Sequence, residues 1–361
     1  MSLDNIVEPL LAWYRANHRI LPWRESKNPY YIWISEIMLQ QTRVEAVKPY
    51  FERFIQAFPS IQAVADAKEE QLLKMWEGLG YYNRVRNIQK AARTVVEQYE
   101  GSLPADYEQL RGLSGIGNYT AGAISSIAYG IPAPAVDGNV LRVISRIEER
   151  TEDIMKQSTR KNVEQAILEV IPKEAAGYFN QALMELGAMV CVPNGAPLCE
   201  KCPLADLCGA YLHDRTSELP VKSGKKARRI ETRTIILIQD GDKVAIQKRP
   251  VKGLLAGLYE FPNLEGHLTE DEVLDFVTDK QLMPLHIKPL QEAKHIFSHV
   301  EWHMIGYAVK VAALEEEKQG KMLFVDPKET EDIYTIPAAY SAYTKYMNIR
   351  LGQKKYEGDT L

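Results

Sequence analysis

All four cysteines of this 361-residue chain lie within one stretch of eighteen residues, at Cys191, Cys199, Cys202 and Cys208. Four thiolates on one short segment can supply every ligand of an iron–sulfur cluster or of a tetrahedral zinc ion, whereas the cysteines of a disulfide framework are spread along a chain. Zinc ribbons carry two separated Cys-x-x-Cys pairs, and here only Cys199 and Cys202 have that spacing. The uneven gaps therefore favour a [4Fe–4S] cluster, with zinc as the alternative.

The composition is that of an ordinary globular protein of two or three domains. The first residues contain no basic region followed by an apolar stretch, and no apolar run approaches the length that crosses a membrane. We therefore expect a cytoplasmic protein, with no membrane partner, whose cysteines stay reduced and available as ligands. The net charge of −4 argues only weakly against a nucleic-acid partner, because it averages over local patches.

Apolar residues recur every three or four positions up to about residue 212, which predicts helices over 7–16, 32–58, 70–76, 84–99, 121–127, 140–149, 164–171 and 179–189. A basic stretch without periodicity follows and is typical of a linker. Beyond it, residues 234–239 and 244–248 flank Asp240-Gly241-Asp242 as a β-hairpin, residues 302–311 alternate as a strand, and Thr269 caps a short helix. We predict a multidomain protein: an all-α domain at 1–214 with the cysteine loop at 191–208, a linker at 215–233 and an α+β domain at 234–361.

Two glycines, Gly115 and Gly117, lie between two predicted helices in Leu113-Ser-Gly-Ile-Gly-Asn-Tyr119. Glycines two residues apart permit a tight hairpin that presents backbone N–H groups beside a helix N-terminus, a suitable site for a phosphate. A Gly-x-Gly pair alone is weak evidence, and an ordinary helix connector would show it too. With the cysteine loop downstream, we favour a helix-hairpin-helix that binds the DNA backbone.

Two carboxylates are candidates for acid–base chemistry. Glu36 lies in a largely apolar predicted helix, where burial would raise its pKa, although a lone glutamate is more often on the wet face. Asp137 precedes a predicted helix as a candidate N-cap, and the helix N-terminus should keep it ionised. Two carboxylates with different environments are what cleavage of a glycosidic bond requires.

Taken together, these residues resemble the MutY adenine DNA glycosylases, which belong to the helix-hairpin-helix glycosylases similar to endonuclease III. The likeness covers nearly the whole chain and is carried by the order and number of its motifs. Besides the hairpin and the cysteine loop, the matching segments are 17–24, 35–42, 78–82, 136–142 and 179–187. The gap between the first two cysteines is seven residues here and six in the family, a difference that a loop with a glycine and two prolines can absorb.

The resemblance implies a function: hydrolysis of the N-glycosidic bond of adenine paired with 8-oxoguanine or guanine in duplex DNA, in base excision repair, by a monomer with a structural [4Fe–4S] cluster. Glu36 would protonate adenine and Asp137 would stabilise the charge developing on the sugar, assisted by Tyr119 and Asn139. The implied adenine-pocket residues are Arg19, Leu21, Trp23, Arg24 and Gln181.

Tyr119 bears on the choice between close relatives. Endonuclease III-like enzymes that also cut the strand have a lysine nucleophile at this position, so Tyr119 predicts a monofunctional glycosylase. Two alternatives stay open: an endonuclease III-like enzyme for oxidised pyrimidines or other mispairs, and a DNA-binding scaffold whose carboxylates are only structural.

The C-terminal domain resembles the Nudix-like domain of the same family, in 247–250 and 253–262, and lacks the metal-binding box of a Nudix hydrolase. The resemblance assigns the contacts with 8-oxoguanine to residues from both halves of the chain, with Tyr81 as an intercalating wedge and Ser298 as the hydrogen-bonding partner. These contacts are Gln41, Thr42, Leu79, Tyr81, His295, Phe297 and Ser298. Arg84, Arg86, Lys90 and Arg93 could meet phosphates, although such a run is more often a solvated face.

Overall fold

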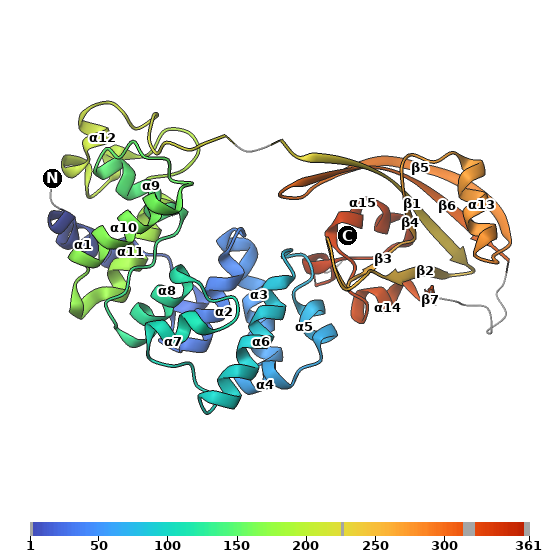
Figure 1. Cartoon of the computed structure of the whole chain (residues 1–361), viewed down its shortest axis with the longest axis horizontal. Coiled ribbons are helices and arrows are strands. Elements are labelled where there is room, and N and C mark those ends of the chain that lie inside the picture. Colours follow the sequence, from blue (N-terminus) through green and yellow to red (C-terminus); the bar gives the residue numbers. More distant parts are fainter. Residues whose placement is uncertain (1–2, 225–226, 313–321, 357–361) are drawn as a thin grey trace. The chain divides into compact units, whose positions relative to one another are not determined.

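The computed structural model describes residues 3–224, 227–312 and 322–356 of the chain (Figure 1). The chain divides into two compact units. The first comprises Met1–Asp66 and Asn87–Gly224, and the second comprises Ala67–Arg86 and Lys225–Leu361. None of the helices in the described parts is long and apolar enough to cross a membrane.

Helices make up most of residues 3–224, as the apolar periodicity predicts. One predicted helix, over 32–58, is in fact two, because Gln41 adopts a left-handed conformation with φ of 64° between them. The helices are α1 (Val7–Asn17), α2 (Pro29–Leu39), α3 (Val44–Ala57), α4 (Ile61–Asp66), α5 (Glu69–Met75), α6 (Asn83–Gln98), α7 (Tyr107–Gly112), α8 (Asn118–Tyr129), α9 (Gly138–Ile147), α10 (Gln157–Val170), α11 (Ala176–Met189) and α12 (Gly209–Leu212).

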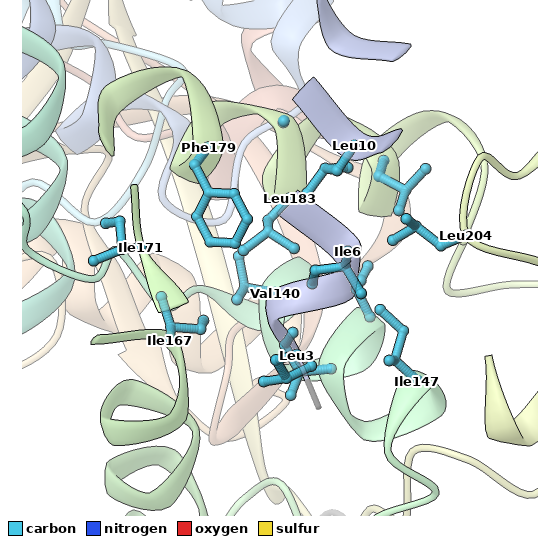
Figure 2. Close-up of a cluster of buried hydrophobic side chains, with 14 of the residues drawn as sticks. Leu3, Ile6, Leu10, Val140, Ile147, Ile167, Ile171, Phe179, Leu183 and Leu204 are labelled. Carbon is cyan, nitrogen blue, oxygen red and sulfur yellow. The ribbon is translucent and has the colours of Figure 1, made fainter. Parts of the chain in front are cut away.

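A cluster of buried apolar side chains joins α1, α9, α10 and α11 (Figure 2). Val140 of α9 and Phe179 of α11 are fully buried in it, and Leu204 enters it from the cysteine segment. Burying each such side chain contributes about 1.5–3 kcal/mol. The same core therefore holds both the start of α9 and the cysteine segment.

The second unit contains a mixed sheet in the order β3-β2-β1-β6-β5, in which β1 and β6 are parallel and the other neighbours are antiparallel. Adjacent residues of β1 alternate between two cores: Ile235 packs with Trp302 and Tyr343, whereas Ile236 packs with Val273 of the helix α13. The sheet is thus covered on both faces. Its elements are β1 (Arg229–Asp240), β2 (Lys243–Lys248), β3 (Tyr259–Glu260), β4 (Asn263–Glu265), α13 (Glu270–Asp279), β5 (Pro284–Ile296), β6 (Val300–Val311), β7 (Leu323–Val325), α14 (Pro327–Asp332) and α15 (Ser341–Thr344).

Several predicted elements of this unit are confirmed. β1 and β2 form the hairpin around Asp240-Gly241-Asp242, and Thr269 caps α13 in a capping box with Glu272. Two elements differ from expectation. β1 begins at Arg229, so residues 229–233 are strand and not linker. The strand β5 was not predicted, because most of its side chains are exposed and it carries two prolines, with a register shift between Leu290 and Ala293.

The short helix α5 is built into the second unit through a buried ion pair. Lys74 Nζ lies 2.9 Å from Glu77 Oε1, and the two side chains are 7% and 1% exposed. Lys74 also donates to the carbonyls of Thr330 and Tyr334, at 2.8 and 3.1 Å. Glu77 accepts hydrogen bonds from the backbone N–H groups of Ile336 and Gly352, both at 3.0 Å. Residues far apart in the sequence are thereby joined in one compact unit.

Lys74→Met should destabilise the protein strongly, because it leaves the Glu77 carboxylate buried without its cation. We expect a loss of about 3–5 kcal/mol in the free energy of unfolding, measured by urea denaturation. The control is Lys48→Met, which breaks a solvent-exposed pair of the same i,i+3 spacing with Glu45 and should cost less than about 1 kcal/mol. Equal losses in the two variants would contradict the assignment of Lys74 and Glu77 as a structural anchor.

Candidate active site

A pocket of about 850 Å³ opens in the first unit between α2, α8, α9 and α11. It brings together all the residues predicted for catalysis and adenine binding, and with them Gln41 and Thr42, which the sequence predicted as contacts of 8-oxoguanine. Those that line it are Arg19, Leu21, Trp23, Arg24, Glu36, Gln41, Thr42, Tyr119, Asp137, Asn139 and Gln181.

Glu36 lies on α2 and faces the pocket. The residue is only 6% exposed, so it is buried and does not lie on the wet face of the helix. Burial raises the pKa of its carboxyl to about 7, with a further rise from the nearby Asp137 carboxyl; a hydrogen bond from the Tyr119 hydroxyl opposes the rise. Glu36 can therefore hold a proton near neutral pH, as a general acid must.

Asp137 is the N-cap of α9, as predicted, and its Oδ1 accepts a hydrogen bond from Val140 N–H at 2.8 Å. The Asn139 side chain donates to Oδ2, also at 2.8 Å. Burial nevertheless raises the pKa of Asp137 above its usual value, and these hydrogen bonds oppose that rise. The two carboxyls differ in what holds them: Glu36 takes one phenolic hydrogen bond, whereas Asp137 takes hydrogen bonds from a helix N-terminus and an amide.

The predicted hairpin lies between α7 and α8. Gly115 has φ of 78°, and a Cβ there would lie 2.7 Å from the Cβ of Asn87, so glycine is required both by the backbone and by the neighbouring side chain. Gly117 is the N-cap of α8, and both glycines are exposed. The hairpin therefore presents exposed backbone at a helix N-terminus, where a phosphate can bind.

Glu185 is a pocket residue that the sequence analysis did not identify. Its carboxylate is 1% exposed and accepts hydrogen bonds from the side chains of Arg19 and Arg24, at 2.8 and 2.9 Å. Although burial alone would raise the pKa of Glu185, these hydrogen bonds lower it to about 2. The helical spacing could have identified Glu185 as a pocket residue, because it lies one turn after the predicted pocket residue Gln181, on the same face of α11.

The four cysteines line one small cavity, together with Arg146, Val190, Pro197, Ala205, Tyr211 and Thr216. Arg146 of α9 donates to Cys191 Sγ at 3.2 Å. Arg142, one turn earlier, donates to the Cys191 carbonyl at 2.7 Å and to Asn139 Oδ1 at 2.8 Å. Among the described residues no group of three or more His, Cys, Asp or Glu side chains is arranged to hold a single metal ion.

The other predicted contacts of 8-oxoguanine lie in the second unit. The Tyr81 hydroxyl and Ser298 Oγ are 2.7 Å apart, and the His295 ring packs edge-on against Phe297 with centroids 4.6 Å apart. Burial lowers the pKa of His295, which favours its neutral form. Leu79 is only 7% exposed, so little of its side chain can reach a ligand.

The chain matches two family models. Residues 34–173 match the HhH-GPD superfamily of base excision DNA repair proteins, and residues 233–346 match the NUDIX domain. In this superfamily name, HhH stands for the helix-hairpin-helix. The first match includes Glu36, Tyr119, Asp137 and Asn139 of the pocket, and the second includes most of the sheet.

Curated relatives extend over almost the whole chain. The adenine DNA glycosylase of Buchnera aphidicola is 34% identical over 92% of this chain and 96% of its own length. The human adenine DNA glycosylase is 32% identical over 96% of this chain and 74% of its own length. Among solved structures, a trapped endonuclease III–DNA covalent intermediate matches with a TM-score of 0.51 and 26% identity, over 60% of this chain and 99% of the other. The chain therefore belongs to the MutY family, the adenine DNA glycosylases of base excision repair.

Proposed function

We propose that this adenine DNA glycosylase acts on adenine paired with 8-oxoguanine or guanine in duplex DNA, and that it hydrolyses the N-glycosidic bond without cutting the strand. The observation that carries the proposal is the pair of carboxyls, Glu36 and Asp137, in one pocket with different hydrogen-bond partners. A base can reach this pocket only after it leaves the stack, and flipping the nucleotide out of the duplex provides that access.

Glu36 is proposed as the general acid. Its buried carboxyl, with a pKa of about 7, would donate a proton to adenine, so that the base leaves as a neutral molecule when the bond to the sugar breaks. Tyr119, whose hydroxyl donates to Glu36, would fix the orientation of this carboxyl. Tyr119 cannot form a Schiff base, which supports the absence of a coupled strand cut.

Asp137 is proposed to stabilise the positive charge that develops on the sugar. The hydrogen bonds from Val140 N–H and Asn139 keep the carboxylate in one orientation, and Arg142 holds Asn139 in turn. A water molecule then adds to the sugar carbon and releases a proton. Arg19, Leu21, Trp23, Arg24 and Gln181 would bind the adenine, with Glu185 holding the two arginines.

Recognition of the opposite base is proposed for Tyr81, His295, Phe297 and Ser298 in the second unit. Tyr81 is 52% exposed although aromatic, which suits a side chain that stacks on a base. Ser298, its hydrogen-bonding partner, is also exposed and offers a hydroxyl that can both donate and accept. Gln41 and Thr42 line the pocket next to Glu36 and are proposed to contact the DNA there.

A [4Fe–4S] cluster is proposed for the cysteine segment, held by Cys191, Cys199, Cys202 and Cys208. Support comes from the four sulfurs around one cavity and from the Arg146 N–H that points at Cys191 Sγ, the kind of donor that surrounds cluster thiolates. Such a group would hold the segment in place for DNA binding, since hydrolysis transfers no electron.

Glu36→Gln and Asp137→Asn should each slow adenine release by roughly 100- to 10,000-fold. The measurement is single-turnover cleavage, after alkali treatment, of a duplex with adenine opposite 8-oxoguanine. Glu52→Gln, an exposed change on α3, is the control and should keep full activity. No product from this duplex, together with strand cutting of a duplex that carries thymine glycol, would assign the chain to the endonuclease III-like alternative.

The single-turnover rate should fall as the pH rises through about 7, because the active form of Glu36 is the protonated one. In the native protein the hydrogen bond from Tyr119 lowers the pKa of Glu36, so Tyr119→Phe should raise this pKa. The falling limb of the pH–rate profile should therefore move to higher pH in this variant. Tyr129→Phe, the same change outside the pocket, should leave the limb in place. A limb that does not move in Tyr119→Phe would rule out Glu36 as the titrating acid.

Metal analysis of protein purified without oxygen should find about four irons and matching sulfide per chain. Cys202→Ala should lose most of the iron, because the chain has no other cysteine to replace it. One zinc ion per chain and no sulfide would instead establish the zinc alternative.

A further inference from the structure

The turn that carries Tyr81 has an unusual backbone. Gly78, Gly80 and Tyr81 all have positive φ, at 99°, 69° and 48°. Glycine adopts this region freely, but a tyrosine there costs of order 1–2 kcal/mol. Such a conformation persists only where the surroundings hold it.

Arg84, in the first turn of α6, holds this backbone. Its Nη2 donates to the carbonyls of Leu79 and Gly80, at 3.1 and 3.2 Å. The indole N–H of the fully buried Trp76 donates to the same Gly80 carbonyl at 3.1 Å. Hydrogen bonds from a charged donor are stronger than neutral ones, so Arg84 fixes the two carbonyls that precede Tyr81.

Arg84 also holds the ring of Tyr81. Its guanidinium carbon lies 5.4 Å from the centroid of the Tyr81 ring and 5.3 Å from that of Trp76. Burial lowers the pKa of Arg84 to about 10, which leaves the guanidinium charged at neutral pH, so both cation–π contacts are kept. At its far end the Tyr81 ring is held through its hydroxyl by Ser298.

We infer that Arg84 is a positioning residue: it holds the Tyr81 side chain in the orientation in which it reads the base opposite the adenine. The inference rests on the proposed function of Tyr81. It differs from the solvated or phosphate-binding role that a run of basic residues on α6 suggests, because the Arg84 guanidinium is engaged with protein carbonyls and rings. Lysine is a poor replacement, since an ammonium lacks the planar guanidinium that lies beside the rings of Trp76 and Tyr81.

The test is Arg84→Lys, which keeps the charge. We would measure the dissociation constants for duplexes that carry an uncleavable adenine analogue opposite 8-oxoguanine and opposite guanine. The ratio of the two constants should fall by roughly tenfold, about the effect of losing charged hydrogen bonds. The single-turnover rate at saturating enzyme should not change. Arg93→Lys is the matched control, because Arg93 lies on the same helix and also donates to a carbonyl, that of Ala65 at 3.1 Å. In this variant the ratio of the two dissociation constants should equal that of the wild type.

A double-mutant cycle shows whether Arg84 acts through Tyr81. In a Tyr81→Leu background, Arg84→Lys should cause no further loss of preference. An additive loss, or an equal weakening of both duplexes by Arg84→Lys, would overturn the inference. If Arg84→Lys does not fold, as judged by circular dichroism, Arg84→Gln replaces it in the same cycle. This change removes the charge and the cation–π contacts, so the same loss of preference is expected.

Different results would overturn the proposed function and the role of Arg84. A wild-type protein that does not excise adenine would overturn the proposed function, whatever Arg84 does. A wild-type protein that excises adenine with a preference for 8-oxoguanine, combined with an Arg84→Lys variant of unchanged preference, would overturn only the role of Arg84.

Discussion

The arrangement of the first unit depends on the burial of one helix, α9. Its apolar residues lie in the core shared with α1, α10 and α11, its first residue follows the Asp137 cap, and its arginines reach the cysteine segment. Arg142 contacts both Asn139 and the Cys191 carbonyl. A helix buried in this way cannot shift at one end alone, so the position of the Asp137 carboxylate and the path of the cysteine segment are set together.

The acidity of the pocket follows from what surrounds each carboxyl. Burial raises the pKa of Glu36 to about 7, and the single hydrogen bond from the Tyr119 hydroxyl opposes that rise only in part. Glu185 is also buried, but it faces two guanidinium groups, which lower its pKa to about 2. Burial acts in the same direction on both. The charge of the neighbours decides the difference, so one pocket contains a carboxyl able to hold a proton and another that serves as a permanent counter-ion.

Local patterns in the sequence predicted the longer helices, the Asp137 cap, the hairpin at Gly115 and Gly117 and the strands of the β1–β2 pair, because each depends on residues close together in the chain. The short helices α4, α7, α12, α14 and α15 were not predicted. Contacts between distant residues were not predictable in this way. Glu185 binds arginines more than 160 positions away, and Arg84 turns toward the protein where a basic run suggested solvent or phosphate. The strand β5 was missed because its mostly exposed side chains show no apolar alternation.

The division of the chain at residues 67–86 has a consequence for how the protein can be taken apart. Because this segment belongs to the same compact unit as the C-terminal sheet, the chain passes between the two units three times, near residues 66, 86 and 224. Cutting the linker severs only one of these passages. A fragment that ends at residue 224 would keep α5 but leave the Lys74–Glu77 pair without Thr330, Tyr334, Ile336 and Gly352. The C-terminal sheet is therefore not a module joined to the rest of the chain by the linker alone, and a transplant of the sheet would have to carry residues 67–86 with it.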